Sequence, residues 1–89
     1  MKYKVKIFFN FTHSNGDMCK LIFYKNRKYH RLNGPAIEYV DGDSMWFKDG
    51  LFHRTNGPAI EWADNAKEWW VEGDEYSERK FKKIVKKIK

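Results

Sequence analysis

The chain contains one ten-residue phrase twice, and this repetition constrains the fold more than any other feature. The phrase is His-Arg-x-Asn-Gly-Pro-Ala-Ile-Glu followed by an aromatic residue, and it runs from 30 to 39 and again from 53 to 62. Eight of its ten positions are identical, at an offset of 23 residues. Such a repeat predicts structural units that stack on one another and share a core.

Each phrase predicts a turn followed by a strand. Asn-Gly tolerates positive φ, whereas the Pro that follows cannot donate a hydrogen bond, so we expect a widened loop with Pro as the first strand residue. Segments 36–40 and 59–63 then place Ile and an aromatic on one face and Glu on the other. Turn pairs recur every seven to nine residues from 33 to 73. The sequence therefore predicts a mainly β fold, an antiparallel β-meander built from ~23-residue hairpin repeats.

The two ends of the chain have different patterns. In residues 2–11 apolar side chains occupy every second position, with Lys2, Lys4 and Lys6 on the opposite face. Asn15-Gly16-Asp17 separates this segment from a second apolar run at 18–25, which predicts a hairpin. Residues 77–89 carry apolar side chains at i, i+3, i+4 and i+7, beginning at Phe81. This spacing predicts one C-terminal amphipathic basic α-helix with Ser77 as its N-cap.

Charge divides the chain into three parts. The net charge is +6, but residues 1–28 and 77–89 each carry seven basic and one acidic side chain, whereas residues 29–76 carry four basic and ten acidic ones. We expect a single domain, 1–89, made of a basic hairpin, an acidic repeat region and a basic helix. Its small core makes a homodimer a natural possibility. The lone Cys19 excludes a disulfide framework, and no signal peptide or membrane-spanning run is visible, so a cytoplasmic location is expected.

Two strongly basic ends favour an anionic partner, and we expect RNA bound largely without sequence specificity, because no base-reading motif is visible. Alternatives are a solvated face, lysines that protect an edge strand, or an anionic membrane surface, the last disfavoured because the helix stripe lacks Trp and Leu. The candidate RNA-binding residues are Lys2, Lys4, Lys6, Arg27, Lys28, Arg79, Lys80, Lys82, Lys83, Lys86 and Lys87.

His30 and His53 could act as the general base and acid of a small ribonuclease. They occupy equivalent positions of the repeat, however, so a shared structural contact is the simpler interpretation. Spacing suited to a metal site or a phosphate-binding glycine loop is absent, and no cofactor is expected. The aromatic residues could stack on bases, but in so small a chain they are more often core; they are Tyr39, Trp46, Phe47, Trp69 and Trp70.

The His-Arg-x-Asn-Gly-Pro-Ala phrase, with Trp between its copies, resembles short MORN-like repeat proteins of phages and bacteria over about residues 23–76. The resemblance implies an all-β antiparallel sheet without catalytic activity. A small basic chain with a Lys-rich first strand and a Lys-rich last helix also resembles T4-type phage inhibitors of a host ribonuclease toxin. That resemblance implies RNA binding that sequesters or blocks the toxin.

The leading hypothesis is therefore a non-enzymatic, phage-type RNA-binding protein that antagonises a host RNA-targeting defence. A host ribonuclease toxin is a second expected partner, and the protein is expected to act in the host cytoplasm. The first alternative is a protein–protein interaction module, whose acidic face would contain Glu38, Asp43, Glu61 and Glu68. The second alternative is the two-histidine ribonuclease.

Overall fold

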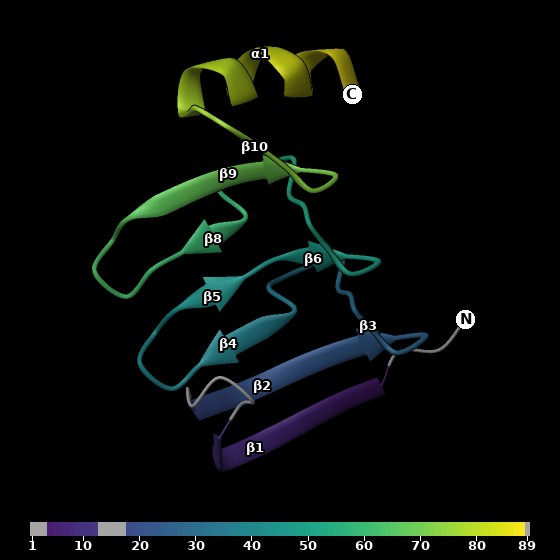
Figure 1. Ribbon diagram of the computed structural model, residues 1–89, viewed down its shortest axis with the longest axis vertical. Helices are drawn as coiled ribbons and strands as arrows, with labels where there is room; N and C mark the ends of the chain where they lie inside the picture. The colour runs from purple at the N-terminus through teal and green to yellow at the C-terminus, as the bar shows by residue number, and fades with distance from the viewer. Residues whose placement is uncertain (1–3, 13–17, 89) are drawn as a thin grey trace.

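The computed structural model describes residues 4–12 and 18–88, with side chains from Ile22 to Lys87. The elements are β1 (Lys4–Thr12), β2 (Met18–Lys25), β3 (Lys28–Tyr29), β4 (Ile37–Tyr39), β5 (Ser44–Met45), β6 (Phe47–Lys48), β7 (Leu51–Phe52), β8 (Ile60–Glu61), β9 (Lys67–Val71), β10 (Asp74–Tyr76) and α1 (Glu78–Ile88) (Figure 1). The predicted mainly β class with one C-terminal helix is confirmed.

The larger sheet has eight strands, in the order β1-β2-β4-β5-β8-β9-β10 with β3 paired to β2, and β6 pairs with β7 separately. Every described pair is antiparallel, as predicted. The meander is nevertheless interrupted, because β6 and β7 form a ladder of their own instead of joining the main sheet. The molecule measures 39 × 35 × 18 Å, and β1 and α1 lie at opposite ends of its longest axis (Figure 1).

The two ends follow the sequence pattern closely. Strand β2 has the predicted bounds, whereas β1 is described from Lys4 to Thr12; the predicted turn at 15–17 lies outside the described residues. At the other end, the Lys80 amide donates a hydrogen bond to the Ser77 hydroxyl at 3.2 Å, and α1 begins at the next residue, Glu78. The predicted N-cap is therefore confirmed.

The core is small and follows the repeated phrase. Ile22, Ile37 and Tyr39 form one buried cluster. Ala36 and Ala59 are both completely buried, and each joins two neighbouring segments through its backbone. The Ala36 carbonyl accepts a hydrogen bond from the Phe23 amide, and the Ala36 amide donates to the Met45 carbonyl, both at 2.8 Å. In the same way, the Ala59 carbonyl accepts from the Trp46 amide at 2.7 Å, and the Ala59 amide donates to the Glu68 backbone carbonyl at 2.8 Å. A side chain larger than Ala at either position would have to fit entirely within the packed interior, where added volume is usually destabilising.

Two of the predicted turns are tight hairpins. Asp49-Gly50 and Glu72-Gly73 join β6 to β7 and β9 to β10, with φ of 50° and 84° in the first and 51° and 88° in the second. Positive φ at both central residues matches the twist of the flanking strands. The turn between β2 and β3 has the same conformation without glycine, with φ of 51° at Asn26 and 65° at Arg27.

The loops of the repeated phrase differ from the prediction in where the strands that follow them begin. Neither Gly34 nor Gly57 adopts positive φ. A Cβ on either would lie 2.8 Å from the guanidinium carbon of the Arg three residues earlier, so the glycine allows that guanidinium to lie close to the backbone. Strands β4 and β8 also begin two residues after the Pro, and not at it.

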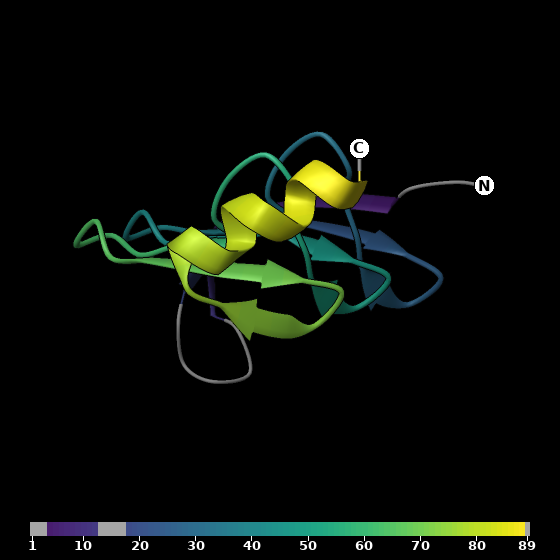
Figure 2. The same ribbon diagram turned by 90° about the horizontal axis from the view of Figure 1, so that it is seen from above.

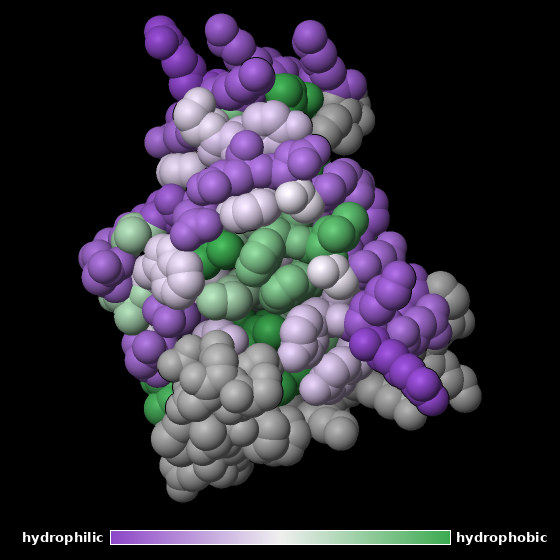
Figure 3. Space-filling model, in the orientation of Figure 1, coloured by the Kyte–Doolittle hydropathy of each residue, from purple (hydrophilic) through white to green (hydrophobic). Residues whose placement is uncertain are grey.

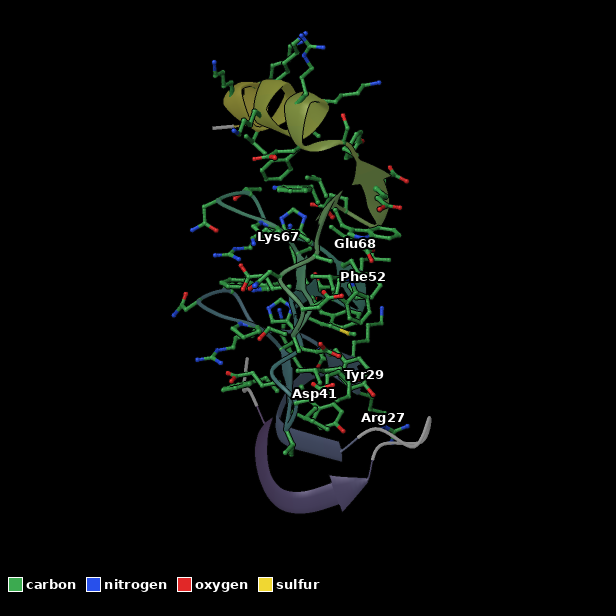
Figure 4. All side chains as sticks on the ribbon, turned by 90° about the vertical axis from the view of Figure 1, so that its left-hand side faces the viewer. Arg27, Tyr29, Asp41, Phe52, Lys67 and Glu68 are labelled. Atoms are coloured by element: carbon green, nitrogen blue, oxygen red, sulfur yellow. The ribbon has the colours of Figure 1, made fainter. Side chains whose placement is uncertain are left out.

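Five aromatic rings form a ladder through the hairpins. The ring centroids are 5.5 Å apart for Tyr24–Tyr29, 5.2 Å for Tyr29–Phe47, 4.5 Å for Phe47–Phe52 and 5.1 Å for Phe52–Trp70. Tyr29 and Phe52 lie one above the other along the long axis (Figure 4). The face of the molecule that Figure 3 shows has an apolar area in its middle. These spacings are favourable for ring–ring contact.

The aromatic core predicted from the sequence is thus only partly correct. Of the five residues assigned to it, Tyr39 is buried, whereas the other four are half-buried; these are Trp46, Phe47, Trp69 and Trp70.

Candidate nucleic-acid interface

The basic helix α1 is the most strongly charged described surface. Phe81, 4% exposed, anchors the helix, which packs against β9 and β10. The six predicted cationic side chains on α1 are all exposed; they are Arg79, Lys80, Lys82, Lys83, Lys86 and Lys87. Hydrophilic side chains extend beyond the sheet at this end of the molecule (Figure 3). A buried apolar anchor with exposed cations is an arrangement that suits contact with phosphates.

Few carboxylates neutralise this helix. Lys82 lies 3.3 Å from Glu78, one turn earlier, and the other α1 cations form no ion pair with any described side chain. Lys86 and Lys87 lie in the last turn, where the helix dipole favours positive charge, and Glu78 lies in the first turn, where it favours negative charge. The helix is therefore stabilised locally while most of its charge remains available to a partner.

The remaining predicted RNA-binding residues lie elsewhere. Lys2 lies outside the described residues, and Lys4 and Lys6 lie on β1, at the far end of the 39 Å axis from α1. Arg27 and Lys28, both exposed, lie at the β2–β3 turn, also far from the helix (Figure 4). The structure thus places the two basic ends apart, and a single short polyanion does not span both.

The two histidines make the same hydrogen bond. His30 Nδ1 accepts the backbone amide of Asp49 at 2.9 Å, and His53 Nδ1 accepts that of Glu72 at 3.0 Å. Each ring therefore holds the first residue of a hairpin turn 19 positions later in the chain. Because Nδ1 is an acceptor in this contact, the neutral ring carries its proton on Nε2.

The surroundings of His53 favour the neutral ring. Burial lowers its pKa from the ordinary value of 6.5, the Glu72 carboxylate opposes this shift, and Lys48 adds to it. Glu72 Oε2 lies 3.8 Å from His53 Nδ1 and 3.0 Å from Lys48 Nζ. A neutral His53 preserves the hydrogen bond to the turn, since a protonated Nδ1 could not accept it.

The arginine beside each histidine organises its own loop, through contacts with an aromatic ring and a proline carbonyl that the sequence alone did not specify. The Arg31 guanidinium lies 3.9 Å from the centroid of the Phe23 ring and donates to the Pro35 carbonyl at 3.2 Å. Arg54 lies 3.7 Å from the centroid of Trp46 and donates to the Pro58 carbonyl at 3.0 Å. The fixed spacing of His-Arg from Asn-Gly-Pro, with an aromatic seven or eight residues earlier, is the signal that could have indicated these contacts.

The two loops border one pocket of about 150 Å³. Its lining includes Arg31 from the first copy of the phrase and His53, Arg54 and Asn56 from the second. Trp46 and Lys48, which lie between the two copies in the chain, also line it. The pocket is thus built from both copies of the phrase and from the hairpin between them. No carboxylate is among its lining residues, although it lies within the acidic part of the chain.

The acidic residues of the alternative interaction face have internal partners. Glu38 lies 3.9 Å from Arg31, and Glu61 lies 3.4 Å from Arg54. The Glu68 carboxylate accepts the indole N–H groups of Trp62 and Trp70, at 2.9 and 3.0 Å. Asp43 accepts the backbone amide of Ala63 at 2.6 Å. Three of these carboxylates have partners nearby in the chain, and Asp43 reaches the segment after the second copy of the phrase, which leaves less of their charge for a basic partner.

Comparison of the chain with protein-family models, curated protein sequences and solved structures found no match. Within residues 4–12 and 18–88, no group of three or more His, Cys, Asp and Glu side chains is placed to hold a metal ion. In the same part of the chain, the single helix lacks the length and the apolar character that crossing a bilayer requires.

Proposed function

We propose that the protein is a non-enzymatic RNA-binding protein whose main contact surface is α1. The observation that carries this proposal is the row of six exposed cations on a helix whose apolar side is already occupied by its own sheet. Such a helix contacts phosphates without reading bases, so its binding is insensitive to sequence and weakens steeply with salt.

Reversal of two helix charges tests the proposal. Lys83 and Lys87 are exposed, and neither forms an ion pair with a described side chain, so the double variant Lys83→Glu/Lys87→Glu leaves the docking of α1 intact. We expect RNA affinity to fall at least tenfold and the slope of log K against log salt to decrease by about two units, one for each lost phosphate contact. Fluorescence anisotropy with a labelled single-stranded RNA measures both quantities.

A matched control separates local from global charge. Lys67 is exposed, lies on β9 and is not among the predicted contacts, so Lys67→Glu changes the net charge as much as one helix reversal does. Lys83→Glu alone should weaken binding more than Lys67→Glu. Equal effects of the two, or unchanged affinity in the double variant, would contradict the assignment to α1. A labelled DNA of the same sequence tests the preference for RNA.

We further propose that this binding antagonises a host RNA-targeting defence in the host cytoplasm, by shielding RNA from a ribonuclease toxin. The support is the sequence resemblance together with the exposed helix. In this scheme the protein slows cleavage of a labelled RNA by a single-strand-specific ribonuclease, and Lys83→Glu/Lys87→Glu does not. Protection that is independent of the helix charges would point instead to direct contact with the ribonuclease.

The histidine contacts support a non-enzymatic role. His30 is only 2% exposed. In both rings the unprotonated nitrogen, Nδ1, accepts a hydrogen bond from a backbone amide, and a general base would need that nitrogen to take up a proton. The expected result is no cleavage of RNA by the purified protein beyond that of a His53→Ala preparation. Cleavage that disappears in this variant would favour the ribonuclease alternative.

A further inference from the structure

Most of the basic side chains in the acidic region, residues 29–76, line the pocket between the two loops. Residues 29–76 contain four basic side chains, and three of them, Arg31, Lys48 and Arg54, line this pocket; the fourth, Lys67, does not. Each of the three has a carboxylate nearby, at 3.9 Å for Arg31, 3.0 Å for Lys48 and 3.4 Å for Arg54, but none of those carboxylates is part of the lining. The side facing the pocket is therefore cationic.

Hydrogen-bond donors remain available there. The hydrogen bonds of Arg54 to described residues use Nε and Nη1, and that of Arg31 uses Nη1. Within the described part of the chain, Nη2 of each guanidinium donates to no protein acceptor. Stacking on Phe23 and Trp46 fixes the planes of both groups, which reduces the entropy lost when they bind an anion.

The size of the pocket limits what it can hold. At about 150 Å³ it is smaller than the roughly 300–1,000 Å³ typical of sites for whole small molecules or cofactors. A single tetrahedral anionic group matches both this volume and the donors. Nη2 of each guanidinium can donate a charge-assisted hydrogen bond to the anion, with lysine as an additional point charge and the His53 Nε2–H as a neutral donor.

We propose that this pocket, bordered by Arg31, Lys48, His53 and Arg54, is a phosphate-binding site that takes one phosphate group of a nucleotide. The anion site stands on the pocket alone, whereas its occupation by a phosphate of RNA rests on the proposed function. Both loops arch out on the side of the sheet on which α1 lies (Figure 2), so RNA bound to the helix can extend across the same side. The site would then fix one phosphate of a strand that α1 holds less specifically.

The test is a titration of the intact, ¹⁵N-labelled protein with uridine 5′-monophosphate, followed by ¹H–¹⁵N correlation spectra at low salt. Uridine, which lacks the phosphate, is the matched ligand control. The expected result is saturable shifts of the Thr55 and Asn56 amides and the Trp46 indole with the nucleotide only. Lys48→Gln should weaken this binding about tenfold, the size expected for loss of one charged hydrogen bond. Lys67→Gln, the matched control, should leave it unchanged.

A second variant does not remove an existing contact. Thr55 lines the pocket, and Thr55→Glu adds a negative charge at its border, so it should abolish nucleotide binding while the remaining spectrum shows the protein folded. Saturable shifts at the pocket that persist in Lys83→Glu/Lys87→Glu support the site even if RNA binding by α1 fails. Shifts confined to α1 would overturn the pocket while leaving the proposed function in place, and absence of saturable shifts would overturn the pocket as well.

Discussion

The two copies of the phrase make the same bonds in different surroundings. In both, a histidine holds the next hairpin turn, at 2.9 and 3.0 Å, and an arginine holds a proline carbonyl, at 3.2 and 3.0 Å. The side chain of His30 is 3% exposed, however, whereas that of His53 is 15% exposed. The same residues thus give the same hydrogen bonds, and the burial of those bonds depends on what packs around each copy.

The difference follows from position in the chain. The first copy is followed by a second His-Arg, whereas Tyr76 and Ser77 stand where a third would fall, and α1 packs against this end instead. The residue beneath the arginine also changes, from Phe23 in the first copy to Trp46 in the second. The comparison teaches that the phrase determines local bonds, while its neighbours determine how much energy each bond contributes.

The largest expected effect is the contrast between the histidines. His30→Ala should lower the free energy of unfolding by about 3 kcal/mol, because it removes a buried ring and leaves the amide of Asp49 without its acceptor. His53→Ala should cost about 1 kcal/mol, because water can reach the Glu72 amide more easily. Urea unfolding followed by tryptophan fluorescence measures both. Equal losses would show that the difference in burial has no energetic consequence.

Substitution of the glycine in each copy of the phrase should cause a smaller loss of stability, and one that is similar in the two copies. Gly34→Ala or Gly57→Ala places a methyl group 2.8 Å from the neighbouring guanidinium carbon, so the guanidinium must shift, which weakens its contacts with the ring and the proline carbonyl. We expect a loss of about 1–2 kcal/mol in each case, the value of a hydrogen bond together with an aromatic contact. The control is Gly34→Ala with Arg31→Ala, which should cost little more than Arg31→Ala alone. Additive losses would show that the glycine acts through backbone torsion.

The smallest expected effect is the pH dependence contributed by His53. Its pKa is lower in the folded protein than the 6.5 of the unfolded chain, so the unfolded state binds more protons below about pH 6.5. Stability from this group is therefore complete above pH 6.5 and decreases as the pH falls from there toward the folded pKa. The variant His53→Asn keeps a side-chain acceptor that does not titrate, and its stability should vary less between pH 7.5 and 5.5. Identical pH profiles would assign the dependence to other groups.

Much of the local structure could be predicted from the sequence. The bounds of β2, the N-cap at Ser77, the helix α1 and the turns at Asp49-Gly50 and Glu72-Gly73 all match the sequence pattern. These features depend on alternation, on capping and on backbone torsion, which are properties of neighbouring residues. The exposed cations of α1 were predicted for the same reason, since helical spacing alone separates them from the apolar stripe.

Only the tertiary structure decided how distant segments meet. It showed that His30 holds Asp49, that Gly34 makes space for Arg31, that β6 and β7 leave the main sheet, and that the basic ends lie apart. The phosphate pocket likewise requires two loops 23 residues apart to face the same space. A repeat in sequence states which residues are equivalent, but the contacts between units depend on how the units stack. That stacking is determined by packing and hydrogen bonds between segments far apart in the chain, which periodicity does not encode.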